Sequence, residues 1–94
     1  MTSVDLEIRN PSGLHARPAA TFVKAAAAFK SRIQLENVTA GRPASDAKSM
    51  LGVLACGVQK GHTVRVTAEG DDETQAVEAL RALIESGIGE PLEA

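Results

Sequence analysis

Aromatic residues and cysteines are scarce in this chain of 94 residues. The chain has two phenylalanines, Phe22 and Phe29, and neither tryptophan nor tyrosine, so stacking platforms for bases or single strands are nearly absent. The one cysteine, Cys56, excludes an internal disulfide and a zinc site built from cysteines. Small aliphatic side chains must therefore fill the core.

A strong net charge and long apolar runs are also missing. Lys and Arg total 10 and Asp and Glu total 12, a formal net charge of −2, whereas nucleic-acid proteins normally carry a basic excess. No apolar run approaches the roughly 20 residues of a membrane helix, and residues 1–10 lack a signal-peptide pattern. We therefore expect a cytoplasmic protein with no nucleic-acid partner and no direct membrane insertion.

Hydrophobic periodicity predicts the order of elements along the chain. Alternating apolar and polar residues predict strands over 4–9, 32–36 and 63–69, and a poor strand is expected near 40–43. Helical spacing predicts a long helix over 18–30. Ser49 is the right residue type to cap a short helix, and Asp72 with Gln75 forms an approximate capping box for a last helix.

The resulting order, β-α-β-β-α-β-α, predicts an α+β fold. Strands with one polar face favour an antiparallel sheet that is covered by helices on its other face. The length fits one domain, which we expect over residues 1–94, with an ordered core over about 3–87 and a tail over 88–94.

The residues with the clearest chemistry lie between Asn10 and Ala20. A turn places His15 directly before a helix start, where free N–H groups and the helix dipole stabilise an anion. Arg17 adds a guanidinium that matches phosphate geometry, and a neutral imidazole is a good nucleophile. These features predict a phosphoryl group held on His15. The alternative is an ordinary solvated histidine beside a common helix-start arginine.

Three blocks of the sequence resemble the HPr family, the phosphocarriers of the bacterial sugar phosphotransferase system. Gly13–Ala20, followed by Phe22 and Val23, is similar to that family's active-site signature. Ala47–Leu54, continuing to Val58, resembles its serine-site helix, and Val64–Gly70 resembles its last strand. The match runs in order from about Val4 to Ile84. The resemblance implies an open-faced sandwich of four antiparallel strands covered by three helices.

The same resemblance implies a role for each site residue. His15 would be phosphorylated on Nδ1 by enzyme I, which draws on phosphoenolpyruvate, and would pass the group to a histidine of a sugar-specific IIA protein. Arg17 would steady the phosphoryl group. Ser12 and the backbone N–H groups of Ala16 and Arg17 would complete the phosphate site. The chain would thus be a stoichiometric, monomeric carrier rather than an enzyme, with no cofactor and no metal.

Apolar residues around the site are candidates for docking these partners: Phe22, Met50, Leu51 and Leu54. Their alternative role is core packing, which we favour for Phe22 and Leu54. Ser49 is a candidate for regulatory phosphorylation by an HPr kinase/phosphorylase, because phosphate is tolerated at a helix N-terminus. Its alternative role is a plain N-cap. His62 is expected in an exposed turn, and Cys56 is expected as a packed side chain.

Two features depart from common free-standing carriers. The stretch 37–47 is longer than usual, and residues 85–91 resemble HPr domains inside larger phosphotransferase polypeptides. The alternatives left open are a paralogue or excised domain serving a fructose, dihydroxyacetone-kinase or nitrogen-regulatory branch, and a regulatory protein that acts through phospho-Ser49. A His-dependent phosphatase is less favoured, because no second acid or base accompanies His15.

Overall fold

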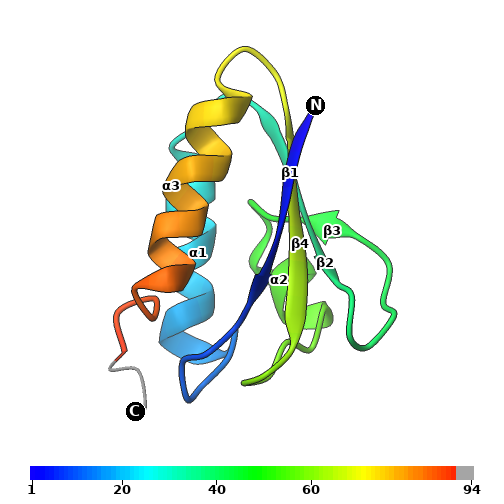
Figure 1. Cartoon of the computed structure of the whole chain (residues 1–94), viewed down its shortest axis with the longest axis vertical. Helices are drawn as coiled ribbons and strands as arrows, with labels where there is room; N and C mark the ends of the chain where they lie inside the picture. The colour runs from blue at the N-terminus through cyan, green and yellow to red at the C-terminus, as the bar shows by residue number, and fades with distance from the viewer. Residues whose placement is uncertain (91–94) are drawn as a thin grey trace.

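The computed structural model of the chain describes residues 1–90 (Figure 1). Its elements follow the predicted order and are, in sequence, β1 (Thr2–Glu7), α1 (Ala16–Ala27), β2 (Arg32–Asn37), β3 (Ser45–Asp46), α2 (Met50–Ala55), β4 (Thr63–Glu69) and α3 (Glu73–Glu85). Among residues 1–90, no helix is both long enough and apolar enough to cross a membrane.

The strands form one antiparallel sheet in the order β1-β4-β2-β3. Its central strand, β4, pairs Val66 with Val4 of β1 and with Leu35 of β2. Alternate residues of the strands are buried, among them Leu6, Ile33, Leu35, Val64, Val66 and Ala68. The predicted sheet with one polar face is thus confirmed.

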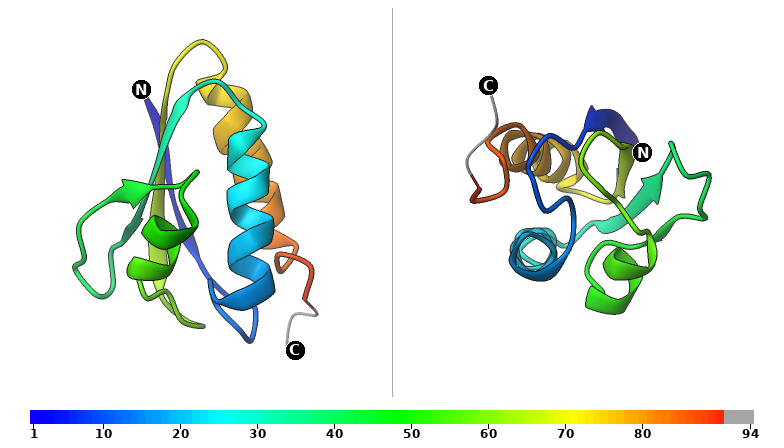
Figure 2. Two further views of the ribbon diagram at one scale, coloured as in Figure 1. Left: turned by 180° about the vertical axis from the view of Figure 1, so that it is seen from behind. Right: turned by 90° about the horizontal axis from the view of Figure 1, so that it is seen from below.

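The helices lie on the apolar face of the sheet. Figures 1 and 2 show α1 and α3 side by side, running roughly along the strands, with the short α2 next to α1. Phe22 of α1 and Leu80 of α3 are completely buried between the layers. The predicted α+β open-faced sandwich with four antiparallel strands and three helices is confirmed.

The third strand lies elsewhere than predicted. Residues 40–43 form a turn and loop, and the strand is confined to Ser45–Asp46. The Asn37 side chain accepts a hydrogen bond from the Ala40 N–H, and Gly41 adopts a φ of +67°. Pro43 has no N–H to donate to a sheet. Because these residues form a turn and a loop, most of the long 37–47 stretch connects β2 to β3. The prediction of a strand at 40–43 was therefore wrong.

The predicted capping box of α3 is also wrong. Asp72 is the N-cap residue, but its side chain makes no capping hydrogen bond. Its carboxylate instead accepts hydrogen bonds from the Lys30 N–H, the Ser31 N–H and the Ser31 hydroxyl. Asp72 therefore joins the α1–β2 connection to the start of α3. With the Lys30 and Ser31 N–H groups held there, α1 ends at Ala27, short of its predicted end at Lys30.

Acid is expected to weaken the fold through carboxylates at this end of the molecule. Hydrogen bonds from the Thr2 hydroxyl, the N-terminal amine and the Gly70 N–H lower the pKa of Glu73 to about 2, and the Ser31 hydroxyl lowers the pKa of Asp72. A pKa depressed by folding gives stability that is present above the unfolded value and lost as pH falls through the folded value.

Urea unfolding at pH 7, 5 and 3 should therefore show a stability loss between about pH 5 and pH 2. Glu73→Gln should reduce that loss. Thr2→Val should reduce it partly, because the Thr2 hydroxyl is the largest cause of the low Glu73 pKa. An unchanged pH dependence in Glu73→Gln would contradict the assignment.

Ser49 caps α2 as predicted. Its hydroxyl oxygen accepts a hydrogen bond from the Gly52 N–H at 3.1 Å, and its carbonyl accepts one from the Val53 N–H at 2.9 Å. We expect Ser49→Ala to lower the unfolding free energy by about 1 kcal/mol. Thermal unfolding checks this, with Ser49→Thr as the control because it keeps the hydroxyl. Equal losses in the two variants would argue against the capping role.

The chain continues to pack on the domain after α3. Ile88 is buried, and the Glu90 side chain contacts the β1–α1 loop. Figure 1 shows this segment and that loop at the same end of the molecule. The last four residues of the predicted tail, 91–94, lie outside the residues that the structure describes.

Candidate functional site

The loop between β1 and α1 is held in place by hydrogen bonds on both sides of Gly13. The buried Asn10 side chain donates to the Gly13 carbonyl at 2.8 Å, and the Leu14 N–H donates to the Val58 carbonyl at 3.1 Å. Gly13 has a φ of +59°, and a Cβ there would lie 2.5 Å from the Val58 oxygen. Leu14 is completely buried. The folded core thus determines where the next residue, His15, emerges.

His15 is the exposed N-cap residue of α1. Its backbone is extended, with φ −122° and ψ 159°, and its imidazole makes no capping hydrogen bond. The next residue, Ala16, has a φ of +50°, which is unusual for a residue with a Cβ. Within residues 1–90, the N–H groups of Ala16 and Arg17 meet no acceptor. They are available to an anion beside His15.

An open pocket of about 300 Å³ adjoins His15. Its lining comes from the β1–α1 loop and from the segment that follows α2: Pro11, Ser12, His15, Gln59 and Lys60. The structure therefore brings His15 and Ser12, two of the predicted site residues, into one hollow at the surface. A small anion could enter it, and so could a side chain of another protein.

Ser12 already has a partner on this side of the pocket. Its N–H and hydroxyl donate to the two carboxylate oxygens of Glu90, at 3.1 and 2.8 Å. Asn10 donates to the same carboxylate at 2.9 Å. The hydrogen bond from Asn10 and those from Ser12 lower the pKa of Glu90, and the positive charge of Arg17 lowers it further. The carboxylate is therefore ionised at neutral pH.

Sequence reasoning missed Glu90 and Asn10 as parts of the site. Glu90 falls in the segment expected to be a tail, 78 residues along the chain from Ser12. Asn10 had a local signal, since asparagine before Pro11 marks a turn, but that signal does not indicate a contact with the other end of the domain. Arg17 lies, as expected, in the first turn of α1, with its side chain exposed.

The predicted docking residues separate into two groups. Leu51 is 81% exposed, and Met50 and Leu54 are each 37% exposed. All three belong to α2, and the segment after α2 forms part of the His15 pocket. Phe22 is completely buried in the core, because it lies on the face of α1 that packs on the sheet. Core packing, the role favoured for Phe22, is therefore confirmed, and Phe22 is no longer a candidate for docking. Core packing was also favoured for Leu54, and its exposure corrects that prediction.

The other reactive side chains have structural roles. The His62 Nδ1 lies 3.1 Å from the Asn37 side-chain nitrogen and 3.2 Å from the Gln59 N–H, so His62 is part of a hydrogen-bonded turn and is only partly exposed. Cys56 is buried, as predicted. Among residues 1–90, no group of three His, Cys, Asp or Glu side chains could hold a metal ion.

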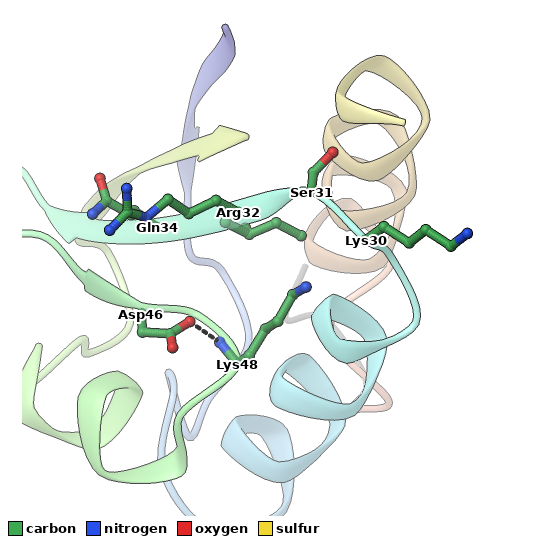
Figure 3. A pocket seen from close by; sticks show the side chains of 7 residues that line it. Lys30, Ser31, Arg32, Gln34, Asp46 and Lys48 are labelled. Carbon is green, nitrogen blue, oxygen red and sulfur yellow. Dashed lines mark hydrogen bonds between the residues drawn. The ribbon is translucent and has the colours of Figure 1, made fainter. Parts of the chain in front are cut away.

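A second pocket, of about 290 Å³, lies at the far end of α1, around the start of β2. Helix α1 has 12 residues, so its two ends are about 18 Å apart. Figure 3 shows Lys30 extending away from Lys48, and Arg32 running in the opposite direction from Lys30. The Lys48 ammonium donates to the Phe29 carbonyl at the end of α1. These cations do not converge on a common point, so the pocket does not form an anion site.

Comparison with known proteins identifies the family to which the chain is similar. A family model described as "PTS HPr component phosphorylation site" matches residues 2–86. The chain is 46% identical over 84 residues to the phosphocarrier protein HPr of Haemophilus influenzae, an alignment that covers 89% of this chain and 95% of that protein.

The chain is also similar to a protein of solved structure and to one domain-sized part of a much longer protein. A crystal structure of HPr-C-His from Thermoanaerobacter tengcongensis is similar with a TM-score of 0.92 and 48% identity, over 98% of this chain and 100% of that one. The multiphosphoryl transfer protein of H. influenzae is 44% identical over 87 residues. The alignment covers 93% of this chain but only 17% of that relative's length.

Proposed function

The chain belongs to the HPr family of phosphocarriers of the phosphotransferase system, and we propose that its phosphoryl group is carried on His15. In this proposal His15 Nδ1 accepts the group from phospho-enzyme I, whose own phosphate comes from phosphoenolpyruvate. The carrier then passes the group to a histidine of a IIA protein or domain. It acts in the cytoplasm as a monomer, and it is a stoichiometric carrier rather than an enzyme.

The observation that carries this proposal is the exposed His15 at the first turn of α1, beside N–H groups without an acceptor in the described chain. A phosphoryl group on His15 would lie where the helix dipole and these donors favour negative charge. Arg17, in the same turn, supplies a guanidinium with donors suited to phosphate oxygens.

Exposure matters as much as binding for a carrier. Phosphoryl transfer needs an in-line approach of the attacking nitrogen, with donors for the charge spread over the phosphoryl oxygens. The His15 lone pair would form the new N–P bond while the bond between the phosphorus atom and the donor protein breaks and its electron pair returns to the donor group. In the second transfer, the histidine of the IIA protein would attack the phosphorus atom from the side opposite His15 while the N–P bond to His15 breaks. An enclosed site would hinder one of these two encounters.

Partner docking is proposed for the exposed side chains of α2: Met50, Leu51 and Leu54. They are part of the element whose following segment forms one wall of the His15 pocket. A partner that covers this apolar surface would bring its own histidine toward the pocket. Phosphorylation of Ser49 stays a prediction, since the described contacts of its hydroxyl explain its presence as a helix cap.

Incubation with phosphoenolpyruvate and enzyme I tests the function. We expect intact-mass analysis to show one acid-labile phosphoryl group on the chain, and its loss when a IIA protein is added. A chain that takes up no phosphate, or takes up acid-stable phosphate only, would overturn the proposal. The residue that carries the group is tested separately by substitution of His15.

A further inference from the structure

Glu90 occupies the donors on one side of the His15 pocket. Its carboxylate accepts from the Ser12 N–H, the Ser12 hydroxyl and the Asn10 side chain, at 3.1, 2.8 and 2.9 Å. Ser12 and His15 line the same pocket. Because the two residues line one pocket, the Ser12 hydroxyl is expected to donate to oxygens of a phosphoryl group on His15. In the unphosphorylated chain these donors are therefore satisfied by a carboxylate, another anion with oxygen acceptors.

The fold sets the position of Glu90. The chain turns sharply after α3, where Gly87, Ile88 and Gly89 have φ values of +95°, +52° and +82°. Ile88 is buried, and its N–H donates to the Leu83 carbonyl. The Glu90 N–H donates to the Gly87 carbonyl at 3.0 Å. A buried anchor and a closed turn thus direct the carboxylate to the β1–α1 loop.

Charge makes this contact competitive with phosphorylation. A phosphoryl group carries between one and two negative charges at neutral pH, and like charges repel over a few ångströms even in water. The hydrogen bonds from Asn10 and Ser12 keep the Glu90 pKa below its ordinary value, so Glu90 is itself charged. The Ser12 hydroxyl has one proton, so it cannot donate to the Glu90 carboxylate and to a phosphoryl oxygen at once.

We propose that Glu90 is a positioning residue that holds Ser12 until His15 is phosphorylated and thereby raises the phosphoryl-transfer potential of the carrier. The proposal rests on the proposed function of His15. When the N–P bond forms at His15, the Ser12 hydroxyl turns from the Glu90 carboxylate to a phosphoryl oxygen. Glu90 gains no proton and makes no bond to phosphorus. When the group leaves for the next protein, the Ser12–Glu90 contact forms again and favours release.

The test is the equilibrium of phosphoryl exchange between enzyme I and the full chain, at fixed phosphoenolpyruvate and pyruvate. Removing the charge with Glu90→Gln should shift the equilibrium toward the phosphorylated carrier by about fivefold, the ratio expected for one pair of like charges at close range in water. Glu85→Gln is the matched control, since it removes the same charge from a residue that pairs with Arg81 on α3. It should leave the equilibrium unchanged.

A double-mutant cycle isolates the part that acts through the Ser12 hydroxyl. Glu90→Gln should shift the equilibrium less in a Ser12→Ala background than in wild type, because part of its effect acts through the Ser12 hydroxyl and the two residues are in contact. Melting temperatures of every variant provide the structural readout. A loosened segment alone would lower the melting temperature without moving the equilibrium toward phosphorylation.

The outcomes separate this proposal from the function on which it rests. If wild type is labelled and Glu90→Gln has the wild-type equilibrium, the role of Glu90 is overturned and the carrier function stands. An equal shift in Glu85→Gln would also overturn it, because a general charge effect would then suffice. If no variant is labelled, both proposals fail. A shift confined to Glu90→Gln and reduced by Ser12→Ala supports the proposal.

Discussion

Replacing His15 with alanine is expected to abolish labelling of the chain by phosphoenolpyruvate and enzyme I. The change removes the nucleophilic nitrogen, and the remaining donors of the site can bind an anion but cannot form an N–P bond. Intact-mass analysis should show wild type gaining one phosphoryl group and His15→Ala gaining none. The variant should fold normally, since the His15 side chain is exposed and makes no capping hydrogen bond.

The matched control is the other histidine of the chain. His62→Gln keeps a side-chain acceptor for the Asn37 and Gln59 donors that contact Nδ1 in wild type. We expect full, acid-labile labelling of this variant. Labelling that persists in His15→Ala and disappears in His62→Gln would move the phosphoryl site to the turn before β4, and equal labelling of both variants would exclude either histidine.

Replacing Gly13 with alanine is expected to cost about 2–5 kcal/mol of unfolding free energy, from left-handed backbone strain of about 1–2 kcal/mol and overpacking of about 1–3 kcal/mol. The φ of +59° disfavours any residue with a Cβ, and that Cβ would lie 2.5 Å from the Val58 oxygen and 2.8 Å from the Gln59 Cα. Both neighbours are backbone atoms, which cannot move aside as a flexible side chain can. Urea or thermal unfolding measures the loss.

Gly41 separates these two causes. Its φ is +67°, close to that of Gly13, but a Cβ there would have nothing within 4 Å. Gly41→Ala should therefore cost about 1–2 kcal/mol, the strain alone. The additional loss of unfolding free energy in Gly13→Ala measures the cost of overpacking where the His15 loop lies close to the segment after α2. Equal losses in the two variants would show that this approach contributes nothing to stability.

Local sequence signals predicted most of the elements because their causes are local. Alternation of apolar residues gave the limits of β4 directly, and the hydroxyl of Ser49 caps α2 through a bond to a residue three positions away. The segment around His15 was recognisable for the same reason, since a turn, a histidine and a helix start follow one another within a few residues. The His15 role itself still awaits the labelling experiment.

Features that depend on distant partners were missed. Asp72 has the residue type of an N-cap, yet its carboxylate binds the Lys30 and Ser31 N–H groups, 42 and 41 residues away. Core packing was favoured for Leu54, yet its side chain on α2 is 37% exposed. Local pattern does not reveal which long-range partner will compete for a side chain, because that choice is made when the layers pack.

The sequence by itself determined that this is a small α+β domain, in which His15 precedes a helix start with Arg17 in its first turn. Periodicity and turn chemistry act over a few residues, so these features can be read without the fold. Only the tertiary structure decided that the Ser12 donors face Glu90. That contact joins residues 78 positions apart, and it exists because the buried Ile88 holds the turn after α3 against the core.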